Sequence, residues 1–385
     1  MNYGPPMNNY GKKALALHKK LHGKIGTALK NDIKNRDDLS VVYTPGVAAV
    51  SSHLGKNPQE ANLYTIKSNS IAVVSDGSAV LGLGNIGPEG ALPVMEGKAA
   101  IFKKFAGIDA WPIVLKTQNP KEIIETIINI APGFGAINLE DISAPKCFEI
   151  EEELRNRLDI PVLHDDQWGT AVVVLAGLIN ALKVVKKKIN TIKIVMSGAG
   201  AAGSAIAKLL IEYGAKNIIL IDRAGVIFRG REGNTPEKEM LARITNPSDI
   251  QGELKDAVLL ADVFIGVSSA GLLSPAMVTS MKTKSIVFAM ANPVPEIMPN
   301  DAKNAGAYIV ATGRSDFNNQ INNALAFPGI FRGALDNKVK NFTTAMLIHA
   351  AENIASLVKR PTREKIVPTI FDKNLVKEVS KAIVQ

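Results

Sequence analysis

Acidic side chains follow two consecutive apolar runs of the chain. Glu140 and Asp141 come directly after the run 135–139, and Asp166 comes shortly after the run 161–163. If these runs are neighbouring parallel strands, the three carboxylates meet at one sheet edge, where they would raise one another's pKa unless a cation joined them. An oxygen-only set suits Mg²⁺ or Mn²⁺ rather than zinc. Taken singly, each acid is more typical of a helix N-cap; together, the three favour a divalent-metal site.

Two further side chains could move protons. Lys98 follows Glu96-Gly97 and is expected to open a helix over 99–105, where a lysine opposes the helix dipole. In a desolvated, metal-lined pocket its pKa would fall toward neutrality, which would let it act as a base. Tyr43 lies in a turn with Pro45, where a tyrosine more often packs than catalyses. His164, beside the acids, is interpreted as a packed or hydrogen-bonded residue and not as a ligand.

Residues 198–203 form a GxGxxG sequence, Gly198-Ala199-Gly200-Ala201-Ala202-Gly203. It follows the apolar run 192–196 and precedes an expected helix over 204–213, and the next run ends in Asp222. This order is the dinucleotide fingerprint, in which glycines allow a tight turn and a close approach of backbone N–H groups to the pyrophosphate. A glycine-rich turn in some other α/β protein is the competing interpretation.

The residues after the fingerprint bear on the choice of dinucleotide. Asp222 is expected to bond the adenosine ribose 2′-hydroxyl and to repel a 2′-phosphate, which favours NAD. Arg223 beside it could offset that repulsion and admit NADP. We therefore predict NAD as the cofactor, with NADP as the alternative.

Short apolar runs alternate with amphipathic stretches from residue 70 onward, which predicts βαβ units and parallel sheet. Polar residues collect at the ends of these runs, where open α/β sheets bind ligands. The predicted fold is α/β: an N-terminal α/β catalytic domain over residues 1–160, followed by a Rossmann-type doubly wound dinucleotide-binding domain over residues 161–385. A helix is expected over 12–31, and residues 1–11 are expected to fray. The expected strands are 71–74, 111–115, 135–139, 161–163, 192–196, 217–221, 263–267, 285–289 and 307–311.

Composition narrows the class of protein. Of the 385 residues, 46% are hydrophobic and 21% are charged, as in soluble globular proteins. The lysines behind the net charge of +9 are scattered, so we expect a solvated surface and no nucleic-acid or membrane partner. The single cysteine, Cys147, cannot form an intramolecular disulfide, which fits a cytoplasmic location. The apolar stretch 170–182 is expected to be too short to span a bilayer, and no signal peptide is expected.

The sequence resembles the malic enzymes, particularly the short bacterial type. Matching motifs run in family order from Tyr43 to about Asp336, and their number lifts Tyr43 and Lys98 above the packing interpretation. The segments that carry the resemblance are 43–48, 75–77, 81–87, 93–98, 138–142, 164–167, 198–203, 291–293, 322–323 and 327–329.

The resemblance implies oxidative decarboxylation of L-malate to pyruvate and CO₂, with reduction of NAD(P) and dependence on Mg²⁺ or Mn²⁺. Lys98 would be the general base, oriented by Asp165, and Tyr43 would donate a proton to C3. The remaining site residues follow by motif: Glu140, Asp141 and Asp166 for the metal, and Asn292 and Asn323 for substrate, with Asn292 also near the nicotinamide ribose. Because the family usually forms dimers, a homodimer is expected, and a pocket completed by the partner subunit is compatible with the resemblance.

Three positions depart from the family pattern. Trp168 stands where the short bacterial type usually has histidine, and Lys146 replaces the usual arginine, keeping the charge but losing bidentate geometry. Ala79 fills the place of an arginine with which the larger eukaryotic enzymes grip substrate.

Two alternative functions stay open. A malolactic enzyme would convert malate to lactate and keep its NAD bound. From a different class, the chain could be a catalytically inactive nucleotide-sensing module, although such a module would be expected to have lost Tyr43, Lys98 or one of the acids.

Overall fold

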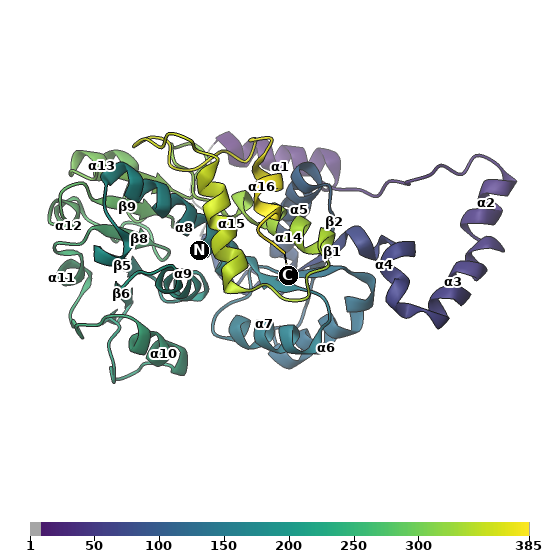
Figure 1. The fold of residues 1–385 in the computed structure, drawn as a ribbon, viewed down its shortest axis with the longest axis horizontal. Coiled ribbons are helices and arrows are strands. Elements are labelled where there is room, and N and C mark those ends of the chain that lie inside the picture. The colour runs from purple at the N-terminus through teal and green to yellow at the C-terminus, as the bar shows by residue number, and fades with distance from the viewer. Residues whose placement is uncertain (1–8, 385) are drawn as a thin grey trace.

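The computed structural model describes residues 9–384, and two mainly parallel sheets lie next to each other along the long axis of the molecule (Figure 1). The first sheet has the order β2-β1-β3-β4 with every pair parallel. Helix α5 (Gly87–Ala106) packs on one face of it, and α6 (Pro120–Ile130) and α7 (Lys146–Arg157) cover the other. Its strands are β1 (Ser70–Ser75), β2 (Asp109–Val114), β3 (Ala136–Leu139) and β4 (Val162–His164).

The second sheet has the order β10-β9-β8-β5-β6-β7. The order reverses between β5 and β8, which is the point where doubly wound sheets bind ligands. All the predicted strands are present in the two sheets. The two-residue strand β7 was not predicted, because a hairpin this short carries no hydrophobic periodicity; it pairs antiparallel with β6. The strands are β5 (Lys193–Ser197), β6 (Asn217–Asp222), β7 (Gly225–Val226), β8 (Val263–Gly266), β9 (Ile286–Ala289) and β10 (Ile309–Thr312).

Helices cover both faces of the second sheet, which explains why its strands read as continuous apolar runs. Along β5, Ile194 joins one hydrophobic core and Val195 joins the other. The flanking helices are α9 (Ala201–Glu212), α10 (Pro236–Ile244), α11 (Leu254–Val258), α12 (Pro275–Thr279) and α13 (Pro299–Asn304).

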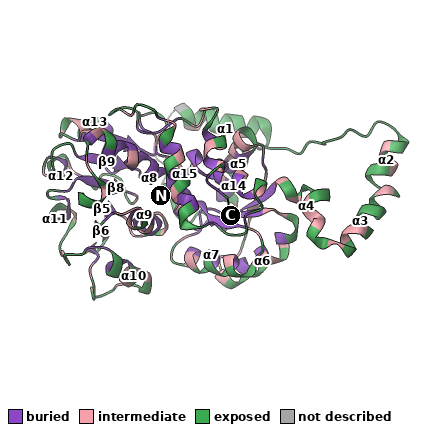
Figure 2. Cartoon of the chain, viewed as in Figure 1, coloured by how far each residue is buried: buried purple, intermediate pink, exposed green. Residues whose placement is uncertain are grey.

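Helix α8 (Asp165–Val185) connects the two sheets through the centre of the molecule. The prediction that its apolar stretch is too short to span a bilayer was wrong on length, because the helix has 21 residues. By length and composition it could cross a membrane, but 72% of its most apolar window is buried inside the protein, as in the core helix of a soluble fold. Figure 2 shows this buried centre between the exposed outer helices.

The C-terminal helices return to the first half of the chain. Helix α14 (Phe327–Asp336) packs on α5, and α15 (Thr344–Ser356) packs on α8 and α16 (Leu375–Ser380). One hydrophobic core therefore runs from α5 through α8 into the second sheet. Strand β4 lies after the predicted boundary at residue 160 yet pairs with β3, so the first sheet extends past that boundary. The division into domains stays a prediction.

The N-terminal segment leaves the body of the molecule as an arm. Helices α2 (Arg36–Val42) and α3 (Gly46–Lys56) project away from both sheets, and neither has a buried residue (Figures 1 and 2). The helix predicted over 12–31 was wrong at its end: α1 (Asn9–Leu21) stops where His22 and Gly23 adopt positive φ. Most of the start that was expected to fray lies outside the described residues. The arm returns through α4 (Ala61–Tyr64), and single 3₁₀ turns span Pro58–Glu60, Ile66–Asn69, Leu81–Leu83, Ala131–Gly133, Ile189–Thr191 and Asn323–Leu325.

Candidate active site

Lys98 lies in the middle of α5, with its ammonium group buried among acids. The residue is 7% exposed, and its Nζ forms an ion pair with Asp165 and lies 2.6 Å from Oε1 of Glu140. The ring centroid of Phe327 is 4.3 Å from the same atom. The prediction that Lys98 opens a helix was wrong, because α5 begins at Gly87 and continues through Pro93. The argument from the helix dipole therefore does not apply to Lys98. Its contacts with the acids are what make it a candidate catalytic residue.

The pKa of Lys98 was predicted to fall, and here the structure differs. Burial alone would lower it, but the charges of Asp165, Glu140 and Asp166 outweigh burial and raise the pKa above its ordinary value. The prediction counted desolvation and overlooked that the acids which would hold a metal also surround the lysine. With these acids charged, Lys98 is held as an ammonium ion.

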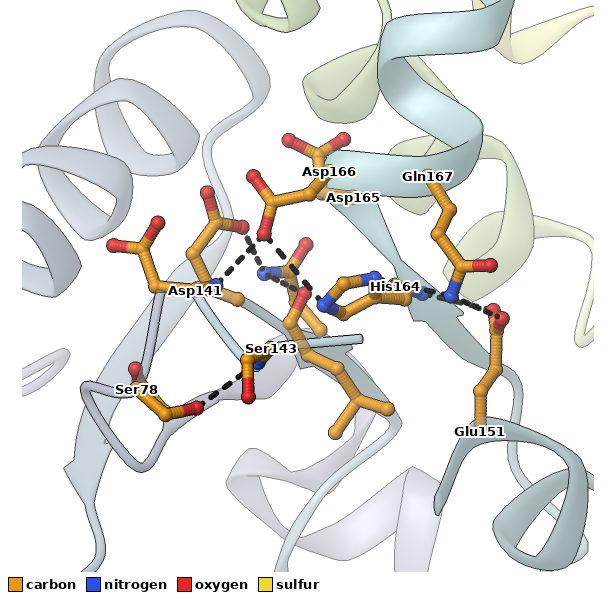
Figure 3. A network of polar contacts seen from close by, with 12 residues as sticks. Ser78, Asp141, Ser143, Glu151, His164, Asp165, Asp166 and Gln167 are labelled. Atoms are coloured by element: carbon orange, nitrogen blue, oxygen red, sulfur yellow. Dashed lines mark hydrogen bonds and ion pairs between the residues drawn. The ribbon is translucent and has the colours of Figure 1, made fainter. Parts of the chain in front are cut away.

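The three predicted metal-binding acids come together at the ends of β3 and β4. One carboxylate oxygen from each of Glu140, Asp141 and Asp166 lies within 4.8 Å of the other two. The backbone N–H of Asp141, whose φ is 53°, donates to Oδ2 of Asp166 at 2.8 Å (Figure 3). Neither aspartate serves as the N-cap of the helix that follows it, since those positions are Pro145 and His164. The capping alternative is therefore wrong for both.

Electrostatics at this cluster favour an added cation. Glu140 and Asp141 are 4% and 3% exposed. Burial raises the pKa of Glu140 well above its ordinary value, and the charges of Asp166, Asp165 and Asp141 raise it further, against the opposing effect of Lys98. Three carboxylates at this separation, two of them buried, are a donor set that Mg²⁺ or Mn²⁺ would satisfy. The residues present fit such an ion.

Asp165 and Asn323 lie close together through a glycine of α8. A Cβ atom on Gly169 would fall 1.8 Å from Oδ1 of Asp165 and 3.4 Å from Cβ of Asn323. Asp165 is fully buried, and burial raises its pKa although Lys98 lowers it. Gly169 therefore leaves the space in which Asp165 turns toward Lys98, and it brings Asn323 to the same side of the helix.

The glycine loop has the geometry that the fingerprint predicts. Gly198 has φ 110°, and a Cβ on Gly203 would lie 1.8 Å from the carbonyl oxygen of Gly198. At Gly200, by contrast, a Cβ would meet nothing within 4 Å, so the backbone there faces open space. Helix α9 begins at Ala201 with no side chain capping its first turn, and Ala202 follows in that turn. A phosphate-sized anion could accept these N–H groups.

Asp222, at the end of β6, is already paired with cations. Arg231 contacts both of its oxygens, at 2.8 and 2.6 Å, and Nζ of Lys238 lies 2.7 Å from Oδ2. Burial would raise the pKa of Asp222, but hydrogen bonds from Arg231 and Lys238 lower it below its ordinary value. Arg223 is exposed and points to no ion-pair partner among the described residues.

Asn292 marks the contact between the two halves of the chain. The side chain of Asn292 is exposed. A Cβ on Gly82 would lie 2.0 Å from the backbone carbonyl oxygen of Asn292. A Cβ on Gly313 would lie 2.8 Å from its Nδ2. Two glycines therefore make room for Asn292 where the loop after β1 meets the loop after β9.

Tyr43 is the one predicted catalytic residue that the fold does not bring to this site. It ends α2 on the projecting arm, and its side chain is 67% exposed. The other sequence-predicted catalytic and metal residues converge on the carboxyl edge of the first sheet, at the start of α8.

Comparison with known proteins decides the family. The sequence model of the malic enzyme N-terminal domain matches residues 22–155, and that of the malic enzyme NAD binding domain matches residues 168–385. This chain belongs to the malic enzyme family. The predicted family, the enzyme class and the α/β fold with a Rossmann-type second half are thereby confirmed.

Individual malic enzymes match over nearly the whole chain. The bifunctional malic/malolactic enzyme of Bacillus subtilis is 53% identical, over 96% of this chain and 91% of its own length. The NAD-dependent malic enzyme of Geobacillus stearothermophilus is 52% identical, over 99% and 80%. The crystal structure of the NAD-dependent malic enzyme of Thermotoga maritima superposes with a TM-score of 0.93 at 50% identity, covering 96% of this chain and 98% of that one.

Two departures from the malic enzyme pattern have a structural account. Lys146 places its Nζ 2.5 Å from Oδ2 of buried Asp76, so the ammonium group at this position neutralises a buried carboxylate. Trp168 donates its indole N–H to Oε2 of Glu151 at 3.0 Å. Nothing in the structure explains Ala79.

Sequence reasoning missed Glu151, Gln167, Arg231 and Lys238 as contributors to these sites. A signal for Glu151 was present, because it lies on the same helical face as Cys147, Ile150 and Leu154, which are buried. An acid on a buried face requires partners. No comparable signal marks Arg231 or Lys238 among the many basic residues of the chain.

Proposed function

We propose that this malic enzyme family member oxidises L-malate with NAD(P) and decarboxylates the product to pyruvate and CO₂ at a Mg²⁺ or Mn²⁺ centre. The observation that carries the proposal is the buried arrangement of Lys98 between Asp165 and Glu140, directly beside the Glu140–Asp141–Asp166 cluster. A base, an oxygen-only metal site and a dinucleotide loop are the groups that this reaction requires. Their joint presence on one chain favours catalysis over a nucleotide-sensing module.

In the first stage, Lys98 in its neutral amine form takes the proton of the C2 hydroxyl of malate. Asp165 orients Lys98 through its ion pair, and Asn323 binds the substrate from the same side of α8. When bound, the dinucleotide supplies the hydride acceptor. The divalent cation supplies a Lewis acid that stabilises negative charge on substrate oxygens, and its positive charge offsets that of the acids around Lys98. The glycine loop would hold the pyrophosphate, and Asn292 would bind the substrate and lie near the nicotinamide ribose.

In the second stage, the bond between C3 and C4 breaks and CO₂ leaves, so that the electron pair remains on the three-carbon fragment as an enolate. Tyr43 then gives its phenolic proton to C3, which yields pyruvate. The exposed position of Tyr43 favours a homodimer in which the arm of one protomer reaches the site of its partner. The apolar surface of that arm, including Val41 and Val42 at 74% and 46% exposure, supports such an interface.

We propose NAD as the preferred dinucleotide and NADP as an accepted one. Asp222 at the end of β6 favours a 2′-hydroxyl, but Arg231 and Lys238 compensate much of its charge. A 2′-phosphate would meet these cations as well as Arg223. The same proposal includes a cytoplasmic location and no nucleic-acid or membrane partner.

A product assay tests the proposal. The protein is incubated with L-malate and Mn²⁺ plus either NAD or NADP, and pyruvate, lactate, CO₂ and reduced dinucleotide are measured. We expect one pyruvate and one CO₂ per reduced dinucleotide. The name of the Bacillus subtilis relative makes malolactic activity the second candidate, which would yield lactate and CO₂ without net reduction of NAD. No product from malate with either dinucleotide would overturn both.

A further inference from the structure

A second buried carboxylate lies behind the acidic cluster. Glu151 on α7 is 4% exposed, and both of its carboxylate oxygens accept hydrogen bonds from N–H donors. Oε1 accepts the backbone N–H of His164 at 2.9 Å, and Oε2 accepts the side chains of Gln167 and Trp168, both at 3.0 Å. Figure 3 shows Glu151 pointing from α7 toward His164 and Gln167.

The residues that donate to Glu151 lie on either side of Asp165 and Asp166 in the sequence. His164 precedes Asp165 and Asp166, and Gln167 and Trp168 follow them. One carboxylate therefore accepts hydrogen bonds from the last residue of β4 and from the first turn of α8. Rotation of the first turn of α8 would move Asp165 away from Lys98 and Asp166 away from the other acids.

The network continues from Glu151 to a metal-binding acid. Nε2 of Gln167 also lies 3.1 Å from Nδ1 of His164, which therefore accepts a hydrogen bond and leaves the proton of the neutral ring on Nε2. That Nε2 is buried, has no hydrogen-bond partner within residues 9–384, and lies 3.6 Å from Oδ2 of Asp166. The imidazole is thus fixed in orientation against Asp166 by the residues that Glu151 holds.

A carboxylate is the group that this position requires. All the partners of Glu151 in the network donate, and an amide would present its own NH₂ to at least one of them. Trp168 suits the arrangement because an indole N–H can only donate. The tryptophan that departs from the family pattern therefore keeps a donor on Oε2.

We propose that Glu151 is a positioning residue for the metal centre: it fixes the start of α8 against the end of β4 so that Asp165 meets Lys98 and Asp166 meets the cation. This inference rests on the proposed function, since it concerns the ion which that function requires. Partners behind the ligands of a metal commonly set its affinity.

The test compares Glu151→Gln with Glu152→Gln, an exposed neighbour on the same helix. Mn²⁺ binding is measured by electron paramagnetic resonance of the free ion, without malate or dinucleotide. We expect Glu151→Gln to weaken Mn²⁺ binding roughly tenfold or more, and Glu152→Gln to leave it within about twofold. NADH binding, measured by fluorescence, should stay unchanged in both, which a general loss of structure would not allow.

A second pair of variants covers the case in which Glu151→Gln does not fold. Trp168→Phe keeps an aromatic ring but removes one donor, and it should weaken Mn²⁺ binding several-fold, whereas Trp168→His restores a ring N–H and should bind as the wild type does. Folded Glu151→Gln or Trp168→Phe protein with wild-type Mn²⁺ affinity would overturn the inference alone. Wild-type protein that binds no Mn²⁺ would instead overturn the proposed function.

Discussion

The ammonium group of Lys98 lies 2.6 Å from Oε1 of Glu140, so the proposed base and one proposed metal ligand form a buried ion pair. Both groups are almost inaccessible to water, at 7% and 4% exposure. A cation bound by Glu140 would offset the negative charge of this carboxylate, which now stabilises Lys98 as an ammonium ion. This contact couples proton transfer to metal binding, and the first two predictions follow from it.

Replacing Lys98 with alanine should abolish malate oxidation and leave dinucleotide binding intact. Loss of a general base costs on the order of 10²–10⁴-fold in rate, while the glycine loop lies on the other half of the fold. Malate-dependent reduction of NAD and fluorescence of bound NADH are the measurements. Lys104→Ala, an exposed lysine on α5, is the control. Turnover near the wild-type rate in Lys98→Ala would remove the base assignment.

Removal of divalent metal should inactivate the enzyme, and Mn²⁺ or Mg²⁺ should restore it. Asp141→Asn is the sharper variant, because asparagine tolerates the positive φ of this position and only the charge is lost. We expect Mn²⁺ affinity to fall at least about tenfold. Asp159→Asn, whose side chain is 96% exposed, should behave as the wild type. Full activity after exhaustive chelation would contradict the metal site.

Replacing Asp222 with asparagine should shift the preference toward NADP. The substitution removes the negative charge that repels a 2′-phosphate and leaves Arg231 and Lys238 in place. We expect the ratio of kcat/KM for NADP to that for NAD to rise about tenfold, the equivalent of about 1.4 kcal/mol. An unchanged ratio would show that Asp222 does not contribute to recognition of the adenosine ribose.

Mixing two inactive variants tests the arm. If Tyr43 acts in the partner's site, refolding Tyr43→Phe with Lys98→Ala gives mixed dimers with one site that has both residues intact. With random pairing, about half of the dimers are mixed and one of the two sites in each is intact, so about a quarter of the wild-type activity returns. If each protomer used its own Tyr43, no mixed site would be complete, and the mixture would stay inactive.

Cys147 should resist alkylation in the folded protein. Burial raises the pKa of its thiol to about 12, and the charge of Glu151 adds to the effect. The reactive thiolate is therefore scarce at pH 8. Because the unfolded thiol ionises from about pH 9, this group lowers the free energy of unfolding as pH rises from about 9 to about 12. Iodoacetamide labelling at pH 8, followed by mass spectrometry, should detect modification only in denatured protein.

The sequence by itself determined the parts of this protein that depend on local pattern. Short apolar runs predicted the strands, since helices cover both faces of each sheet and most strand residues are buried, apart from those of the edge strand β2. The spacing of Gly198, Gly203 and Asp222 predicted the dinucleotide loop. Both glycines are required locally, because Gly198 has a positive φ and a Cβ on Gly203 would collide with the carbonyl oxygen of Gly198. The acids Glu140, Asp141 and Asp166 were predicted to meet because parallel strands end at one sheet edge.

Only the tertiary structure decided the environment of those residues. The pKa of Lys98 is raised rather than lowered because acids from β3 and α8 surround it, and Asp222 is paired because Arg231 and Lys238 fold back onto it. Tyr43 stands away from the acids because the chain leaves the body after α1, and Glu151 is recognisable only by what packs against it. Charge and burial depend on groups that are distant in sequence and close in space, so no local pattern contains them.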